Sequence, residues 1–319
     1  MSGLIDVHCH LAALPTAANG CKISAKMLKS PAARMVAYME GLPLDRPEEA
    51  NAKYLARLSA ELGASTRVSQ AVALAMDGVY DDSGRLDEAH TEFLISNDFV
   101  FDACRKSPKL LAGASVNPRR RDALDELSRC AGLGAALVKS LPNAQVYDPA
   151  DPAYAPYWKR MAELGLPLLS HIGFEFTLIG HDQSVGYPER LIGALEAGVK
   201  VIAAHGCSNG VFFKEPHLKT MEDMMRRFPN FYVDLSALSL PNRVGALLRL
   251  SRRPDLSARF LFGTDYPLPC FSYPALAGGL GAFWGAFGKG NRFDRHAAVL
   301  DALGVAAGAD PRAVLRLPA

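Results

Sequence analysis

Eight short apolar runs rich in β-branched residues recur along the 319-residue chain, and a segment with helical spacing separates most of them. Alternating strands and helices predict a parallel sheet, because parallel neighbours need a long crossover connection. Eight repeats are enough to close such a sheet, so the sequence predicts an α/β fold, the (β/α)8 or TIM barrel. The expected strands are residues 4–11, 66–76, 110–118, 135–142, 166–173, 199–206, 231–238 and 259–267.

Proline, glycine and polar residues mark several of the expected helices. Pro188 stands at a first helical turn, and Gly198 stands just past the end of the same helix. In the segment 117–132, Asn117 is expected to cap a helix that begins at Pro118. The three arginines at 119–121 would then lie in its solvated first turn.

Residues 12–65 form an interval too long for one helix, and within it 26–41 and 47–63 have helical spacing. Because this insertion follows the first strand, it starts at the carboxyl-terminal mouth of the barrel, where active sites of this fold lie. We therefore expect a helical lid or a partner surface, for example that of a homodimer. Three of its methionines are expected to fill the space between its helices: Met27, Met35 and Met39.

Length and composition favour one domain over residues 1–319. Apolar residues make up 49% of the chain and charged residues 21%, and no Ser/Gly-rich or Pro-rich linker divides it. The balance of 35 Lys and Arg against 33 Asp and Glu argues against a nucleic-acid partner. No run of 18 apolar residues predicts a membrane span, and the amino terminus lacks an export signal. Six scattered cysteines read as free thiols, so we expect a cytoplasmic protein.

Histidines gather at the ends of the expected strands. His8 and His10 end the first strand, and strict alternation would place them on one face with Asp6, opposite Val7 and Cys9. Two histidines two residues apart are weak evidence alone, because so short a pattern recurs by chance. Further members follow the fifth, sixth and eighth strands: His171, His205 and Asp265. The carboxyl ends of barrel strands converge, so the sequence predicts a cation site with nitrogen and oxygen ligands.

This order of ligands, with the segments SHIG, AAHG and GTDYP, resembles the amidohydrolase superfamily, and in particular its amidohydrolase-2 branch of hydrolases and decarboxylases. The resemblance extends from residue 4 to about 267. It implies that His8, His10 and His171 bind one divalent metal, most often zinc. It also implies that Asp265 is a fourth ligand and general base, and that His205 polarises or orients the substrate.

Other residues have less certain roles. Lys139 stands where binuclear members of the superfamily carry a carboxylated lysine, and it could equally be a charged residue of the rim. We expect one metal per chain and an unmodified Lys139 facing the substrate; carboxylation would instead imply two metals. Arg243 could hold a substrate carboxylate. His181 and His217 are expected at the surface of loops, Cys9 and Cys207 adjoin expected site histidines, and His90 and His296 receive no role.

The expected function is a metal-dependent hydrolase that attacks a carbonyl, in a lactone, amide or ester, of a small anionic substrate. The leading alternative is non-oxidative decarboxylation of a small carboxylic acid, which would use the same metal and the same aspartate. A third hypothesis is an inactive barrel that serves as a binding scaffold. Substrate identity depends on loops whose sequences give no pattern.

Overall fold

The computed structural model describes residues 3–175 and 182–317. Eight parallel strands form one sheet in which the chain order is also the spatial order, and this confirms the predicted (β/α)8 architecture. Their bounds are β1 (Leu4–His10), β3 (Val68–Leu74), β5 (Leu110–Ala114), β6 (Leu137–Ser140), β7 (Leu168–Ser170), β8 (Val201–Ala203), β9 (Phe231–Asp234) and β10 (Phe260–Leu261).

The barrel closes through the residues that follow β10 rather than through β10 itself. The backbone N–H of Val7 donates to the carbonyl of Phe262 at 3.0 Å, and that of His10 donates to the carbonyl of Tyr266 at 2.8 Å. The N–H of Asp265 in turn donates to the carbonyl of His8 at 2.8 Å. Closure therefore brings Asp265 beside the first strand.

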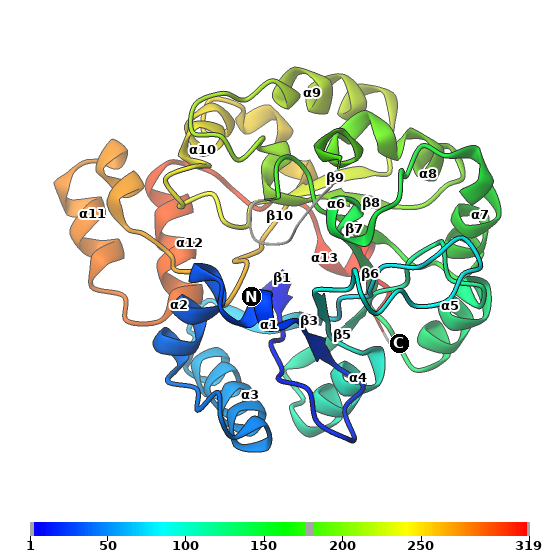
Figure 1. Cartoon of the computed structure of the whole chain (residues 1–319). Coiled ribbons are helices and arrows are strands. Elements are labelled where there is room, and N and C mark those ends of the chain that lie inside the picture. Colours follow the sequence, from blue (N-terminus) through cyan, green and yellow to red (C-terminus); the bar gives the residue numbers. More distant parts are fainter. Residues whose placement is uncertain (1–2, 176–181, 318–319) are drawn as a thin grey trace.

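Helices surround the barrel (Figure 1). The longer ones are α3 (Pro47–Ala64), α4 (Asn97–Lys106), α5 (Ala123–Gly132), α7 (Ala155–Glu163), α9 (His217–Arg227), α10 (Val244–Leu250), α11 (Leu280–Phe287) and α12 (Arg292–Ala302). The shorter ones are α6 (Pro142–Gln145), α8 (Ile192–Glu196) and α13 (Pro311–Val314), with 3-10 turns η1 (Pro152–Tyr154), η2 (Gln183–Gly186), η3 (Pro188–Leu191), η4 (Ala204–Cys207), η5 (Pro254–Arg259) and η6 (Tyr273–Gly278).

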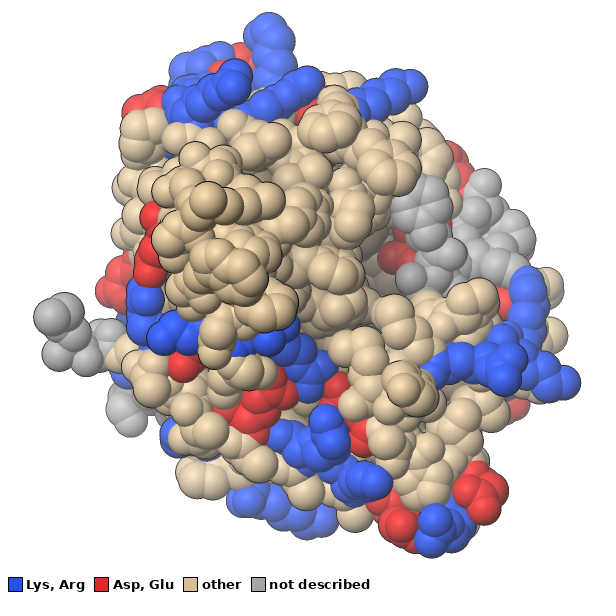
Figure 2. Space-filling view, turned by 90° about the vertical axis from the view of Figure 1, so that its left-hand side faces the viewer, with Lys and Arg blue, Asp and Glu red and all other residues tan. Residues whose placement is uncertain are grey.

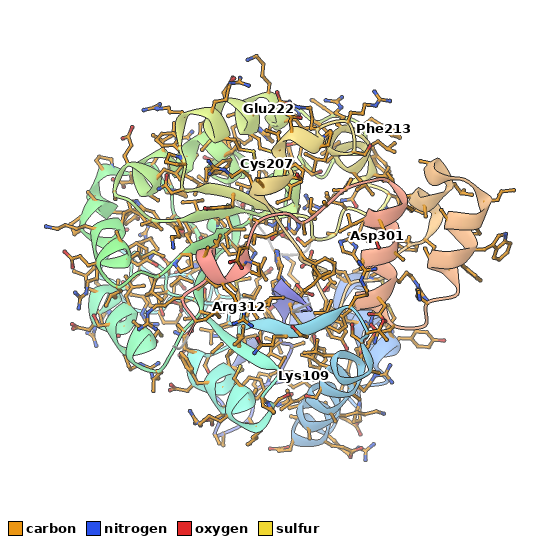
Figure 3. All side chains as sticks on the ribbon, turned by 180° about the vertical axis from the view of Figure 1, so that it is seen from behind. Lys109, Cys207, Phe213, Glu222, Asp301 and Arg312 are labelled. Carbon is orange, nitrogen blue, oxygen red and sulfur yellow. The ribbon has the colours of Figure 1, made fainter. Side chains whose placement is uncertain are left out.

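The core has an inner and an outer part. Inside the barrel, aliphatic side chains from β1, β3, β6, β7 and β8 pack together, and Val314 and Leu315 join them from the carboxyl-terminal end. In Figure 3, α13 with its labelled Arg312 lies across the centre of the ring when the molecule is seen from behind. The larger cluster lies between strands and helices. One end of the barrel is thus closed by the chain, and the strand ends open toward the other.

Residues 12–65 contain β2 (Lys22–Ile23), α1 (Ala25–Leu28) and α2 (Pro31–Glu40) before α3. The short strand β2 pairs antiparallel with β4 (Phe93–Leu94), which the sequence pattern did not reveal. The single helix predicted over 26–41 is wrong, because the chain breaks at Ser30. A residue before proline avoids helical torsions, and Ser30 is extended and caps α2 with its hydroxyl.

The helix predicted from Pro118 is also wrong, since α5 begins at Ala123. The side-chain oxygen of Asn117 accepts from the N–H of Arg119 at 3.0 Å, but it caps only a turn, while its amide donates to the carbonyls of Gly78 and Gln145, at 2.9 and 2.8 Å. The arginines at 119–121 therefore lie in a connecting loop. Arg120 is half-buried there and contacts the carboxylate of Asp77 at 3.3 Å.

One side of the molecule carries a broad apolar patch. On η6 and α11 the side chains of Leu276, Leu280, Trp284 and Phe287 are 49%, 71%, 61% and 58% exposed. Figure 2 shows this apolar expanse with Lys and Arg side chains at its margins. None of the described helices combines the length and apolar composition that crossing a bilayer requires.

Candidate metal centre

An irregularity in β1 aims its two histidines into the barrel mouth. Between Asp6 and Cys9 the chain advances three residues while β3 advances two, from Ala71 to Ala73, which is the mark of a β-bulge. The strict alternation expected over residues 6–10 is therefore wrong: Val7 packs in the inner cluster and Cys9 in the outer one. Asp6 is buried, and its carboxylate accepts hydrogen bonds from the N–H of His8 and from the hydroxyl and the N–H of Thr264.

The bulge and the closure together form a cluster of three metal-ligand side chains. The Nε2 atoms of His8 and His10 lie 3.2 Å apart. Oδ1 of Asp265 lies 3.4 Å from the first and 3.1 Å from the second. One ligand atom from each residue falls within 4.8 Å of the others. Three of the four residues predicted as ligands thus converge on one point.

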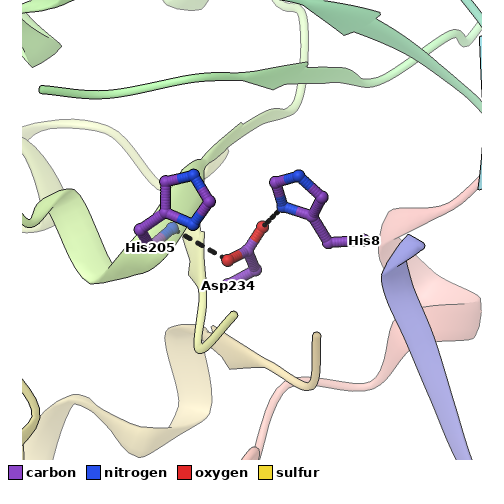
Figure 4. A group of neighbouring side chains, drawn as sticks. All are labelled: His8, His205 and Asp234. Atoms are coloured by element: carbon purple, nitrogen blue, oxygen red, sulfur yellow. Dashed lines mark hydrogen bonds and ion pairs between the residues drawn. The ribbon is translucent and has the colours of Figure 1, made fainter. Parts of the chain in front are cut away.

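Asp234, at the end of β9, holds His8 in place (Figure 4). Its Oδ2 accepts a hydrogen bond from Nδ1 of His8 at 2.7 Å. Its Oδ1 accepts from the N–H of His205 at 2.9 Å, and from both the N–H and the hydroxyl of Ser236, at 3.0 and 2.5 Å. With the proton on Nδ1, the Nε2 lone pair of His8 faces the cluster, as in metal sites where a carboxylate orients a ligand histidine.

A second hydrogen-bond chain leads to His171, the fourth predicted ligand. Because the hydroxyl of Ser236 donates to Asp234, its oxygen accepts from Nδ1 of His205 at 2.8 Å. Nε2 of His205 is left to accept from Nδ1 of His171, 3.3 Å away. Nε2 of His171 is then a lone pair; it is buried and has no hydrogen-bond partner among the described residues. His171 does not belong to the compact cluster with Asp265, so its role as a ligand stays a prediction.

The electrostatics favour neutral imidazoles and a charged carboxylate. Burial lowers the pKa of His8, His171 and His205, and the charge of a nearby lysine or arginine lowers it further. Burial alone would raise the pKa of Asp265, but its interactions with the histidines hold that pKa well below the usual range. Neutral imidazole and carboxylate are the forms that bind a metal.

These residues fit a divalent cation. Nε2 of His8, Nε2 of His10 and a carboxylate oxygen of Asp265 lie within 3.4 Å of one another, and with the imidazole protons on Nδ1 all three atoms can direct lone pairs at one cation. Nε2 of His171 is buried without a hydrogen-bond partner among the described residues, 3.8 Å from Oε2 of Glu175, and it adds a further nitrogen donor. Nitrogen and oxygen donors of this kind suit zinc and manganese alike.

Two cations lie beside the cluster. Lys139, at the end of β6, is buried, and its Nζ is 3.1 Å from Nε2 of His8. Burial lowers the pKa of its ammonium to about 8. Arg243 is also buried, donates to the carbonyl of Ser208 at 3.1 Å and packs against Gly210, where a Cβ would stand 3.4 Å from the guanidinium. Both side chains line the same cavity as the cluster.

This cavity has a volume of about 410 Å³ at the mouth of the barrel. The predicted site residues that line it are His8, His10, Lys139, His171, His205, Arg243 and Asp265. Residues from Leu11 to Asn51 form much of its wall, and they include Met27 and Met35. Those two methionines therefore face the cavity rather than serving only as filler between helices, because the break at Ser30 turns α1 and α2 along the mouth.

The other histidines lie apart from the centre. His217 is buried rather than exposed on a loop: it begins α9, and its Nε2 contacts the side-chain oxygen of Asn209 at 3.1 Å. His296 is buried too, and its Nε2 donates to the carbonyl of Leu235 at 2.9 Å. His90 is exposed and bonded to Asp87. His181 lies outside the described residues.

Sequence reasoning missed Asp234. It lies inside the expected strand 231–238, and the sequence pattern there predicted a strand but no role in the site. A carboxylate that follows three apolar or aromatic residues in a strand covered on both faces is a usable signal, because a buried charge needs partners. Those partners are His8 and the residue pair at 205 and 236, which are distant in sequence.

Solved structures similar to this chain are distant relatives in sequence. An uncharacterised TIM-barrel protein from Bordetella bronchiseptica has 18% identity and a TM-score of 0.60, over 95% of this chain and 100% of that one. A probable 2-pyrone-4,6-dicarboxylic acid hydrolase from Acinetobacter baumannii, with citric acid bound, has 12% identity and a TM-score of 0.53, over 83% and 85%. A 5-carboxyvanillate decarboxylase from Novosphingobium aromaticivorans, with bound manganese, has 15% identity and a TM-score of 0.50, over 83% and 87%.

These likenesses support the barrel fold. No curated protein matches the sequence. The model of a protein family described as amidohydrolase matches residues 5–284, which is most of the chain. This protein belongs to that amidohydrolase family.

Proposed function

We propose that this protein is a metal-dependent hydrolase that attacks a carbonyl, in a lactone, amide or ester, of a small anionic substrate. The observation that carries the proposal is the cluster of His8, His10 and Asp265 beside two buried cations in one open cavity. With Nε2 of His171, which has no hydrogen-bond partner among the described residues, the site has enough nitrogen and oxygen donors for a divalent metal. We propose zinc as this metal.

A bound divalent metal supplies a Lewis acid and lowers the pKa of water to about 7. The chain's own residues do the rest. Asp265, ionised and at the edge of the cluster, accepts the proton of the attacking water and later returns it to the leaving group. Asp234 keeps the proton of His8 on Nδ1, and His205 orients His171 and faces the substrate.

Lys139 and Arg243 hold the anionic part of the substrate. Each brings a positive charge into the cavity wall, and Arg243 has guanidinium N–H groups that can pair with a carboxylate. An unmodified Lys139 is a cation 3.1 Å from a ligand atom, and it would repel a second metal. We therefore propose one metal per chain.

The test is a screen of the zinc-loaded and the manganese-loaded protein against lactones, amides, esters and carboxylic acids, with product formation and carbon dioxide release measured together. Hydrolysis without carbon dioxide supports the proposal. Carbon dioxide from a carboxylic acid, without hydrolysis of any carbonyl compound, would replace it with decarboxylation. An inactive protein under all conditions would favour a binding scaffold.

Metal stoichiometry is tested by titrating metal-free protein with activity as the readout. We expect saturation at about one equivalent, and little metal retained by the His8→Ala/His10→Ala variant in elemental analysis. Saturation at about two equivalents, lost in Lys139→Met and restored by a short carboxylic acid, would show that Lys139 is carboxylated.

A further inference from the structure

The cavity has two chemically different ends. At the floor stand the ligand cluster and the cations Lys139 and Arg243. Toward the mouth the wall is apolar, and much of it comes from one stretch of chain, residues 23–44: Ile23, Met27, Leu28, Val36, Leu42 and Leu44. A small, fully polar substrate would use only the floor.

The apolar side chains of the wall are not fully used in packing α1 against α2. Leu28, Val36 and Leu42 are only partly buried, so that they leave apolar surface facing the cavity. Phe93 and Leu240 extend the apolar lining from other parts of the barrel mouth. These apolar side chains face an open cavity of about 410 Å³, so a ligand that removes them from water binds with a more favourable free energy.

The distribution of charge sets the orientation of such a ligand. The charged side chains of the described lining, the cations Lys139 and Arg243 and the carboxylates Asp265 and Glu175, lie at the floor, whereas no charged residue of the segment 23–44 lines the cavity. An anionic group finds both cations at this end, and the remainder of the molecule points toward α1 and α2.

We propose that residues 23–44 form an apolar subsite, and that the protein selects amphipathic substrates whose anionic group carries an alkyl or aryl body several carbons long. This inference rests on the proposed function only for the position of the reacting carbonyl beside the cluster. The subsite itself is a binding property and is measured without turnover.

The experiment measures binding of straight-chain carboxylates, from butanoate to octanoate, to the zinc-loaded full-length protein by isothermal titration calorimetry. Each added methylene that enters the subsite should tighten binding about fourfold. Octanamide, which keeps the chain and lacks the charge, should bind at least about tenfold more weakly than octanoate, since a hydrogen bond between charged groups is lost. An affinity that does not change with chain length would overturn the proposal.

Variants locate the subsite. Val36→Asn should weaken octanoate about tenfold and leave butanoate nearly unchanged, because the side chain contacts only the far part of the ligand. Tyr38→Asn is the matched control: this residue lies on the same helix, is 88% exposed and does not line the cavity. Leu42→Asn repeats the test from outside α2, so a folding defect in one variant leaves the other to decide. Octanoate affinity equal to wild type in both folded variants would show that the subsite lies elsewhere.

The outcomes separate this inference from the proposed function. Tighter binding with chain length, in a protein that hydrolyses no carbonyl compound of any length, would remove the hydrolase and leave the subsite. Hydrolysis with chain-independent binding would do the reverse.

Discussion

Replacing Asp234 by asparagine should weaken metal binding about 100-fold while leaving every predicted ligand in place. The direction of the amide follows from the structure. Oδ1 of Asp234 accepts three hydrogen bonds, from the N–H of His205 and from the N–H and hydroxyl of Ser236. The amide oxygen must take that position, and the amide nitrogen must then replace Oδ2, 2.7 Å from Nδ1 of His8.

An amide nitrogen facing Nδ1 of His8 changes the tautomer of the ring. Two donors cannot share that contact, so the imidazole proton moves to Nε2, the atom that faces His10 and Asp265. A protonated Nε2 cannot ligate a metal. Loss of a carboxylate that orients a ligand histidine typically costs 10- to 100-fold in affinity, and the forced tautomer places this case near the upper limit, about 2.7 kcal/mol.

The assay is zinc competition between the metal-free protein and a chromophoric chelator. The matched control is Asp294→Asn, the same substitution at another carboxylate, which caps residues 65–67 and does not line the cavity. We expect wild-type zinc affinity in the folded control and the large loss only at 234. An affinity within twofold of wild type in Asp234→Asn would refute the reasoning; it would mean that the Ser236 hydroxyl, 3.1 Å from Nδ1, can accept the proton's hydrogen bond instead.

Three further outcomes follow from the same structure. Asp265→Asn, compared with wild type at full metal occupancy, should abolish turnover, since an amide cannot accept the proton of water; near-normal rates would remove Asp265 as base. Burial raises the pKa of Asp294, but hydrogen bonds from Ser65, Thr66 and Arg67 lower it below the usual value overall, so the stabilisation from the ionised carboxylate is present above pH 3.8 and lost as the pH falls through the folded pKa. Denaturant unfolding of Asp294→Asn and wild type should therefore differ at pH 7 and converge in acid; a constant difference would contradict this. The sequence suggested residues 12–65 as a homodimer surface, but the exposed apolar face of α11 is the better candidate. If the chain forms a homodimer, Trp284→Glu should therefore yield monomers in sedimentation while Tyr38→Glu should not. Monomers in Tyr38→Glu alone would instead place the dimer interface in residues 12–65.

The barrel and most of its candidate ligand cluster could be predicted because both depend on short stretches of sequence. An apolar run predicts a strand wherever it occurs, and a histidine or aspartate at its end lies at the barrel mouth whatever the intervening loops do. His8, His10 and Asp265 were found in this way. The errors at Ser30 and at Asn117 have a different origin. At Ser30 the local effect of the following proline outweighed helical spacing. At Asn117 the side-chain oxygen accepts from the N–H of Arg119 as expected of a cap, but two distant carbonyls bind its amide and only a turn follows before α5 begins at Ala123.

The bulge in β1 shows why the directions of its side chains could not be predicted from the sequence. His8 can point into the barrel mouth although Val7 also packs inside the barrel, because β1 has three residue steps between its contacts with Ala71 and Ala73 where β3 has two. The segment DVHCH alone does not reveal that extra residue. The extra residue is set by closure, because the backbone of His8 and His10 must also meet Asp265 and Tyr266 on the other side. The same closure that inserts the extra residue brings Oδ1 of Asp265 within 3.4 Å of both Nε2 atoms. The ligand types are therefore a property of the sequence, whereas their convergence is a property of the closed barrel. A variant that loosens closure should lose the metal before it loses the fold.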